Sequence, residues 1–364
     1  MSPPTRNARS VNPLPASIDM KRLAYLDALR GIAALLVVFT HLFIPLLDDV
    51  WLFHQLDIGK LGVLWFFMIS GVVIPFSLRP GPDGARRFLI SRFMRLYPAY
   101  WLSLLVFLTM LQLSGGPFPS WPQIVANLSM VQALLGFDDV VGLYWTLFIE
   151  LVFYGLCLLL FMSGKLYDLG VRTRCALGML VLGLILAVFR ELTERKIPVA
   201  LPLALSLMFF GSIWRQWLLG EHSRQLTRCL VVLSGAYLLL LPPTLLLAYG
   251  ENLVEGEAGG RYLLTYTLAI VSFLLLTRSV RLQHPALVWL GSVSYSLYLL
   301  HPSMLLLSQY LLSGLALPPL YAALLGTALT LGAADLSFRY LETPFIQWGK
   351  RLNNRHAKTQ TARA

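Results

Sequence analysis

Ten windows of roughly 20 consecutive apolar residues recur along the chain, and they constrain its fold more than any other feature. A helix needs about 20 such residues to cross the hydrocarbon core of a bilayer. The composition agrees, because 57% of the residues are hydrophobic and only 13% are charged, unlike an ordinary soluble domain. The sequence therefore predicts an all-α, polytopic membrane protein with about ten transmembrane helices. The windows are 28–47, 61–78, 94–114, 143–163, 175–190, 199–214, 229–248, 262–277, 286–312 and 319–341.

The positive charges are distributed unevenly between the segments that join these windows. The formal net charge is +11, which on its own would allow a nucleic-acid partner. With the N-terminus in the cytoplasm, however, 24 of the 29 Lys and Arg residues fall in cytoplasmic segments, as the positive-inside rule requires. We therefore expect cytoplasmic N- and C-termini, a bacterial inner (plasma) membrane location and no nucleic-acid partner. The five remaining basic residues are Lys60, Arg190, Arg195, Lys196 and Arg261.

The chain reads as one membrane domain. We expect a cytoplasmic N-terminal segment over 1–27, the membrane domain over 28–344 and a basic cytoplasmic tail over 345–364. The polar N-terminal segment has no apolar core, so no cleaved signal peptide is predicted. The cysteines have neither disulfide-framework nor metal-ligand spacing, and we expect them to be packing residues and the protein to bind no metal. They are Cys157, Cys175 and Cys229.

The first candidate site lies in the first window, where Arg30 precedes His41 by eleven residues. Ionisable residues in a membrane helix are costly and often functional. Eleven residues of helix place Arg30 and His41 on one face, with about 16 Å of rise between them. That length is similar to an extended pantetheine arm. Alternatively, Arg30 only anchors the helix by snorkelling and His41 makes one interhelical hydrogen bond.

A second candidate site is the cluster of arginines at the cytoplasmic end of the third window. Arg86, Arg87, Arg92 and Arg95 precede Tyr97 and Pro98. Guanidinium groups at this place could bind the phosphates of coenzyme A through charge-assisted, often bidentate contacts. Basic residues at a cytoplasmic helix end also serve topology and anionic lipid headgroups alone, and position by itself favours that alternative.

The fourth window carries a carboxylate near its outer end. Glu150 lies about 10 Å below the outer end of that window, and His41 lies about 9 Å below the outer end of the first. Equal depth predicts that the two side chains meet, in which case the carboxylate would fix the imidazole tautomer and stabilise the imidazolium. Glu150 could equally pair with an arginine, or be protonated and simply hydrogen-bonded.

The ninth window contains a polar and aromatic stripe between Gly291 and Pro302 that includes Tyr298 and His301. Small residues and hydroxyl groups support close helix packing in membranes, which accounts for much of the stripe. His301 is less easily explained by packing alone.

Together these segments resemble the acyltransferase 3 family of membrane acyltransferases, which includes bacterial O-antigen and exopolysaccharide O-acetyltransferases. The resemblance covers nearly the whole chain. Each motif is weak alone, but their order and spacing together are specific. The motifs are Asp27 to His41, Trp65 to Gly71, the arginines before Tyr97, Trp145 to Tyr154, Gly291 to His301, and Tyr340 to Pro344.

The resemblance implies acyl-CoA as co-substrate, acetyl-CoA first among the candidates, with His41 as the base and Arg30, Arg92 and Arg95 binding the donor. One departure is that many members carry an Arg-x-Arg pair, whereas Met94 here occupies the usual second position, which puts the role of Arg95 in question. We treat Glu150 as the second catalytic candidate. The candidate substrate-binding or supporting residues are Ser70, Trp145, Tyr154, Tyr298 and His301.

The predicted reaction is transfer of an acyl group to a hydroxyl of a cell-surface or exported carbohydrate, such as O-antigen or exopolysaccharide. Direct attack with His41 as general base and an acyl-imidazole intermediate both fit. The acceptor could also be a macrolide or a lipid. A transporter or flippase of a lipid-linked or small anionic substrate is the competing class, although we find no inverted repeat. Acceptor selectivity is expected in the outer loops 48–60, 115–142 and 249–261.

Overall fold

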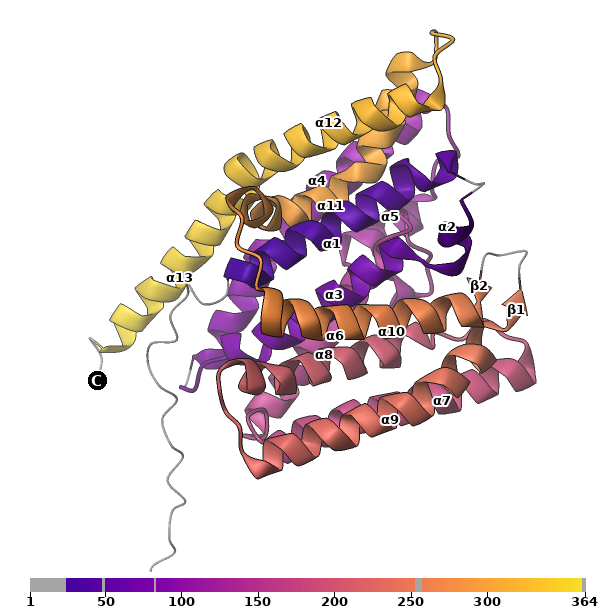
Figure 1. Cartoon of the computed structure of the whole chain (residues 1–364). Helices are drawn as coiled ribbons and strands as arrows, with labels where there is room; N and C mark the ends of the chain where they lie inside the picture. Colours follow the sequence, from indigo (N-terminus) through magenta and orange to yellow (C-terminus); the bar gives the residue numbers. More distant parts are fainter. Residues whose placement is uncertain (1–23, 48–49, 82, 253–256, 362–364) are drawn as a thin grey trace, which may run out of the picture.

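The computed structural model describes residues 24–47, 50–81, 83–252 and 257–361, and these residues are almost entirely helical (Figure 1). The predicted all-α membrane fold is confirmed, and each apolar window overlaps one long helix. These helices are α1 (Ala24–Leu42), α3 (Ile58–Val73), α4 (Gly84–Ser114), α6 (Trp145–Met162), α7 (Leu169–Thr193), α8 (Ala200–Leu218), α9 (Arg224–Tyr249), α10 (Gly259–Leu275), α11 (Pro285–Leu312) and α12 (Pro319–Ser337).

Shorter elements join the long helices. The only strands among the described residues are β1 (Glu251–Asn252) and β2 (Glu257–Ala258), which form one antiparallel pair. The outer loop 115–142 is folded around α5 (Trp121–Leu128) and lies along α4, because Tyr97 donates a hydrogen bond of 2.9 Å to the carbonyl of Ser129. The other short elements are η2 (Ile44–Leu46), α2 (Trp51–Gln55), η3 (Pro75–Ser77), η4 (Gln132–Leu135) and the π-helical turns η6 (Leu276–Val280) and η7 (Phe338–Glu342).

Nine helices of the described chain are long and apolar enough to cross a membrane, one fewer than the windows predict. The exception is α8, which packs against both α3 and α7 and is buried from Pro202 to Arg215. A helix surrounded by protein can carry polar groups that find partners inside the fold. Ser206, for example, donates a 2.8 Å hydrogen bond to the carbonyl of Ala176. α8 therefore forms part of the interior of the helix assembly.

α1 and α11 run parallel and pack closely at two glycines. A Cβ atom added at Gly291 would lie 1.9 Å from the carbonyl oxygen of Asp27, and one at Gly31 would lie 2.6 Å from that of Leu287. Only glycine permits this approach of the two backbones. The contact continues along both helices to His41 and His301. This crossing brings two of the predicted motifs together.

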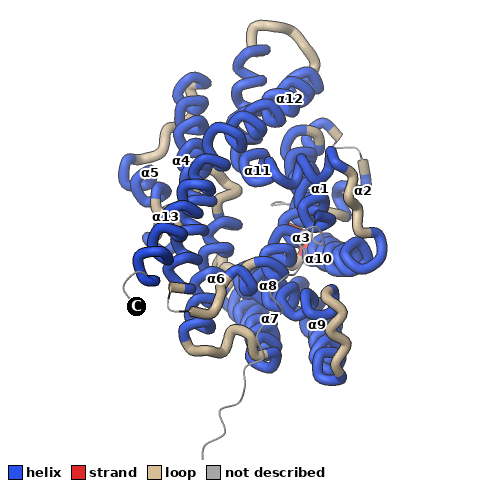
Figure 2. The backbone as a smooth tube through the Cα atoms, turned by 90° about the vertical axis from the view of Figure 1, so that its left-hand side faces the viewer, coloured by secondary structure: helices blue, strands red, loops and turns tan. Residues whose placement is uncertain are grey.

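The central helix is α3, which is among the most deeply buried of the candidate membrane helices. The Asp57 carboxylate caps its first turn by accepting a 2.8 Å hydrogen bond from the backbone N–H of Lys60, as expected of an N-cap residue. α3 contacts α1, α8 and α10. Figure 2 shows α1, α3, α6, α4 and α11 arranged around a common centre, where the candidate site lies.

Two helices extend beyond their predicted windows. α4 begins ten residues before its window and has 31 residues, or about 46 Å of rise, so the arginine cluster lies on the helix itself. α12 continues through η7 into α13 (Thr343–Thr361), which packs against α4. The expected tail is thus helical over 345–361. Most of the expected N-terminal segment, residues 1–23, lies outside the described residues.

Candidate active site

A cavity between α1, α3, α4, α6 and α11 collects most of the predicted site residues. It holds about 710 Å³ of empty space, part of which is open to the outside, and we call it the arginine cavity. Apolar side chains such as Phe66 and Leu147 complete its wall. Seven of the ten predicted site residues line it, although they are distant in sequence. They are Arg30, Ser70, Arg92, Arg95, Glu150, Tyr154 and Tyr298.

Three guanidinium groups give the arginine cavity its charge. Arg30 lies 3.7 Å from the Asp27 carboxylate, and Arg92 lies over the rings of Phe88 and Tyr154 at 5.7 and 5.9 Å. Arg95 lies three residues after Arg92, and residues at this spacing share one helix face. The departure from the Arg-x-Arg spacing therefore does not remove Arg95 from the cavity. An excess of guanidinium groups suits an anionic ligand.

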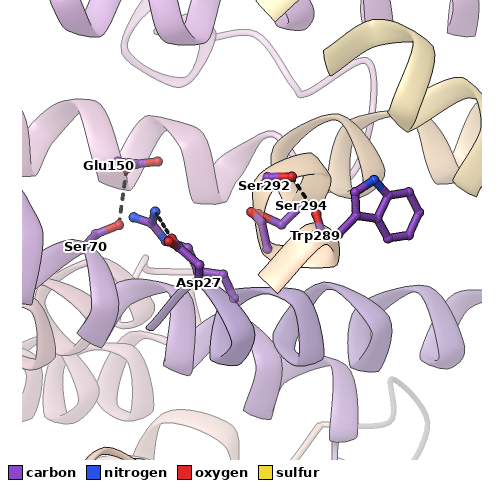
Figure 3. A network of polar contacts seen from close by, with 8 residues as sticks. Asp27, Ser70, Glu150, Trp289, Ser292 and Ser294 are labelled. Carbon is purple, nitrogen blue, oxygen red and sulfur yellow. Dashed lines mark hydrogen bonds and ion pairs between the residues drawn. The ribbon is translucent and has the colours of Figure 1, made fainter. Parts of the chain in front are cut away.

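Glu150 lies on the arginine side of the site. Its carboxylate accepts hydrogen bonds from the hydroxyls of Ser70 at 3.2 Å and Tyr154 at 2.6 Å. Figure 3 shows Ser70 pointing from α3 toward Glu150 on α6, with Asp27 on neighbouring α1. The hydroxyl groups of two helices therefore fix the carboxylate beside the guanidinium groups.

His41 lies near the last residue of α1, where its side chain is exposed. Its Nδ1 atom is 2.9 Å from the carbonyl oxygen of Val37 and 3.3 Å from Nε2 of His301. His301 is fully buried, and its Nδ1 atom is 2.7 Å from the carbonyl oxygen of Tyr298. Among the described residues the partner of the His41 ring is thus another histidine.

The two carbonyl oxygens determine the tautomer of each ring. Nδ1 of His301 must carry the proton because the Tyr298 carbonyl can only accept, so Nε2 of a neutral His301 ring is an acceptor. Nδ1 of His41 then donates to Val37 and His301, which leaves the lone pair of the His41 ring on Nε2. With its proton on Nδ1, the neutral His41 ring has a basic nitrogen, Nε2, on the side away from Val37 and His301.

The expected contact between Glu150 and His41 is replaced by the contacts described above. The predicted depth of His41 assumes that the first helix reaches the end of its window at residue 47. α1 instead ends at Leu42, and η2, with Pro45 at its second position, follows it. His41 is therefore at the end of its helix instead of two turns inside it. Glu150 shares the arginine cavity with Arg30, near the opposite end of α1.

Tyr298 marks the boundary between the arginine cavity and the histidine pair. It lines the cavity, its hydroxyl is 2.9 Å from the hydroxyl of Thr146, and its ring centroid is 6.1 Å from that of His301. Trp145 lies outside this cavity, with its ring edge against Phe67 at 6.3 Å. Tyr298 and His301 are one helical turn apart, so the two parts of the site share α11.

A second, basic pocket adjoins the arginine cavity through Arg92, which lines both. It holds about 1050 Å³ of empty space, and its basic side chains come from the segment between η3 and α4, from the start of α4 and from α13. Asn353 of α13 donates a 3.3 Å hydrogen bond to the carbonyl of Arg87. Sequence reasoning missed the contribution of α13, since the tail was expected to be separate. The cationic residues that line the pocket are Arg79, Arg87, Arg92 and Lys350.

The folded outer loop holds a half-buried carboxylate near the start of α6. Asp139 accepts a hydrogen bond from the side chain of Gln132 and another from the backbone N–H of Trp145. Burial raises the pKa of the Asp139 carboxyl above its ordinary value, and these hydrogen bonds oppose the rise.

In the part of the chain that the structure describes, no group of three His, Cys, Asp or Glu side chains could hold a metal ion.

Comparison with known proteins decides the family. A family model described as an acyltransferase domain matches residues 23–339. The chain belongs to the acyltransferase 3 family. The arginine cavity and the histidine pair both lie within the matched residues. The family assignment agrees with the nine helices of the described chain that are long and apolar enough to cross a membrane.

Individual relatives agree with this assignment. Two Staphylococcus aureus proteins, "Putative O-acetyltransferase SACOL0978" of strain COL and "Putative O-acetyltransferase SAR0937" of strain MRSA252, are each 27% identical over 368 residues. The alignment covers 92% of this chain and 59% of either relative, so the chain spans about three fifths of their length. Acyltransferase MdmB of Streptomyces mycarofaciens is 29% identical over 36% of this chain and 38% of its own. No solved structure matches the chain.

Proposed function

We propose that this acyltransferase 3 protein transfers an acyl group, acetyl in the first instance, from acyl-CoA to a hydroxyl of a cell-surface or exported carbohydrate. The observation that carries the proposal is that the basic pocket, the arginine cavity and the histidine pair follow one another in space. The basic pocket adjoins the arginine cavity at Arg92, and the cavity ends at Tyr298, one turn from His301 and its partner His41.

The donor fits the charged half of this arrangement. Coenzyme A carries several phosphate oxygens on its nucleotide end, and guanidinium groups bind such oxygens through strong, often bidentate contacts. In this proposal the basic pocket and the three arginines of the cavity hold the nucleotide end. The pantetheine arm then runs along the cavity toward Tyr298. The rise from Arg30 to His41 is about 16 Å, which an extended arm can span.

The chemistry follows from the position of the free lone pair on His41. Nε2 of His41 takes the proton of the acceptor hydroxyl while the hydroxyl oxygen attacks the thioester carbonyl carbon. The C–S bond breaks, the sulfur receives the proton, and free coenzyme A and an O-acyl ester result. General-base assistance of this kind contributes roughly 10²–10⁴-fold in rate. His301 supports the imidazole through the Nε2 to Nδ1 contact.

In this proposal Glu150 helps to bind the donor, because it lies in the arginine cavity. Its carboxylate, held by Ser70 and Tyr154, fixes the arrangement of positive charge around Arg30 and Arg92. Trp145 supports the same wall through its ring contact with Phe67. In this proposal the thioester passes Tyr298 and His301, which lie between the arginine cavity and His41, and meets the acceptor hydroxyl at Nε2 of His41.

Two linked measurements test the proposed function. Mass spectrometry of surface glycans from bacterial cells with and without the protein should reveal an acyl mass difference, 42 Da for acetyl by elementary composition. The purified protein in lipid nanodiscs should release free coenzyme A from acetyl-CoA faster when an acceptor extract is added. Identical glycans in both strains, together with no acceptor-dependent release of coenzyme A, would contradict the proposal.

A further inference from the structure

His41 opens onto a groove that differs in chemistry from the arginine cavity. The groove lies between the end of α1 with η2 and the hairpin that joins α11 to α12. Figure 1 shows this hairpin at its top. It holds about 900 Å³ of empty space. The polar side chains among the described residues that line it are His41 and Gln309, and the rest are aliphatic or proline, such as Leu46, Leu305 and Pro319.

The lining excludes a wholly polar occupant. Each hydroxyl of a sugar that leaves water without a hydrogen-bond partner costs free energy. A free oligosaccharide buries many hydroxyls, and this groove offers two polar side chains to meet them. No Asp, Glu, Lys or Arg lines the groove within the described ranges, in contrast to the three arginines of the arginine cavity. The groove therefore suits a neutral, largely apolar ligand next to His41.

The surroundings of the groove show how such a ligand enters. The α11–α12 hairpin carries exposed large apolar side chains, and one of them, Leu317, also lines the groove. Exposed apolar surface of this kind marks contact with lipid or another apolar partner. Leu46 on the opposite edge is exposed as well. A hydrocarbon chain can thus reach the groove from within the bilayer. The exposed hairpin residues are Leu311, Leu315, Leu317, Leu320 and Tyr321.

We propose that the acyl acceptor is a lipid-linked molecule whose hydroxyl-bearing headgroup lies at His41 while its hydrocarbon chain occupies this groove. The inference rests on the proposed function and names its acceptor class. Of the described residues that line the groove, His41 is the one with a role in the proposed reaction. The exposed Gln309, about 12 Å along α11 from His301 by helix rise, is placed to hydrogen-bond a headgroup hydroxyl farther from the reacting one.

The test uses membrane vesicles from cells that contain the protein, supplied briefly with [14C]acetyl-CoA. Label is measured in the butanol-extractable lipid fraction and in the aqueous fraction. Ala322 lines the groove on α12, so Ala322→Phe fills part of it. Ala328→Phe adds the same ring to an exposed position of the same helix and is the matched control. We expect protein-dependent label in the lipid fraction, reduced at least fivefold by Ala322→Phe and unchanged by Ala328→Phe.

Each other outcome has a distinct meaning. Protein-dependent label in the aqueous fraction alone would overturn the lipid-linked acceptor and leave the proposed transfer standing. Lipid label that Ala322→Phe does not reduce would overturn the groove as its binding place. Absence of protein-dependent label from both fractions would contradict the proposed function itself, and the acceptor class with it.

Discussion

Nε2 of His301 lies 3.3 Å from Nδ1 of His41, and this contact follows from equal spacing on two parallel helices. His41 lies ten residues after Gly31, and His301 lies ten residues after Gly291. The two glycines are in contact where the helices cross, and ten residues add about 15 Å of rise to each helix. The close backbone approach at one end therefore places the two imidazole rings together at the other.

Gly291→Ala should weaken both the fold and the transfer reaction. The added Cβ would lie 1.9 Å from the carbonyl of Asp27, so α1 and α11 must separate, and overpacking of this kind costs about 1–3 kcal/mol. Gly235→Ala is the control, because nothing lies within 4 Å of its added Cβ. We expect a lower Tm in detergent and a lower transfer rate for Gly291→Ala alone. Equal Tm values for the two variants would rule out the tight crossing.

His301 is predicted to act as a positioning residue for His41. Gln can place an oxygen acceptor near the position of Nε2, whereas Leu offers none. His301→Leu should therefore lower kcat for acyl transfer by about tenfold or more, within the range of general-base assistance, and His301→Gln should restore part of the loss. The KM for acyl-CoA should stay constant in both variants. A purely packing role would instead give equal kcat values for Gln and Leu at matched Tm.

The arginines of the cavity should determine donor affinity. Removing one guanidinium from a phosphate contact costs about 1.5–3 kcal/mol, so Arg92→Ala and Arg95→Ala should each raise the KM for acyl-CoA at least tenfold. Arg86→Ala removes an exposed guanidinium of the same helix that lines neither cavity, and serves as the control. The KM for acyl-CoA of all three variants is measured from the steady-state rate of coenzyme A release. An effect of Arg86→Ala as large as that of Arg92→Ala would indicate general surface attraction instead of a site.

The raised pKa of Asp139 predicts a pH dependence of stability. The ordinary pKa of the carboxyl is 3.8, and the folded protein holds its proton to a higher pH. The stability that this group contributes is therefore full below pH 3.8 and is lost as pH rises through the folded pKa. As the pH rises from 3.8 through the folded pKa, the Tm of the native protein should fall. The Tm of Asp139→Asn should fall less over the same pH range. Asp138→Asn, at the exposed neighbouring position, removes only the smallest cause of the raised pKa and should reduce the fall in Tm less than Asp139→Asn does.

The sequence was sufficient to predict the helices and to single out three arginines that the fold brings together. Runs of apolar residues determine the membrane helices directly, and the arginines at positions 30, 92 and 95 all line one cavity. The place of Glu150 could not be obtained by counting residues from a window end, because helix ends do not share one plane and Pro45 stops the α1 helix early. Which helix faces which depends on packing.

Two other features lay beyond sequence reasoning for physical reasons. The contact of His301 with His41 depends on the close approach at Gly31 and Gly291, and glycines at such positions also occur for many other reasons. α13 continues past Pro344 because proline is tolerated in the first turn of a helix, so its basic residue Lys350 reaches the pocket beside α4. The equal spacing of the two glycine–histidine pairs was the one signal available in the sequence.

The most direct test of the proposed mechanism compares His41→Ala with His54→Ala in nanodiscs at equal protein abundance. His54 is an exposed histidine of α2 that lines none of the three cavities of the site. The quantity measured is acceptor-dependent transfer of labelled acetyl from acetyl-CoA. We predict a loss of about 10²-fold or more in His41→Ala and native transfer in His54→Ala. Native transfer in His41→Ala would contradict the role of His41 as the base.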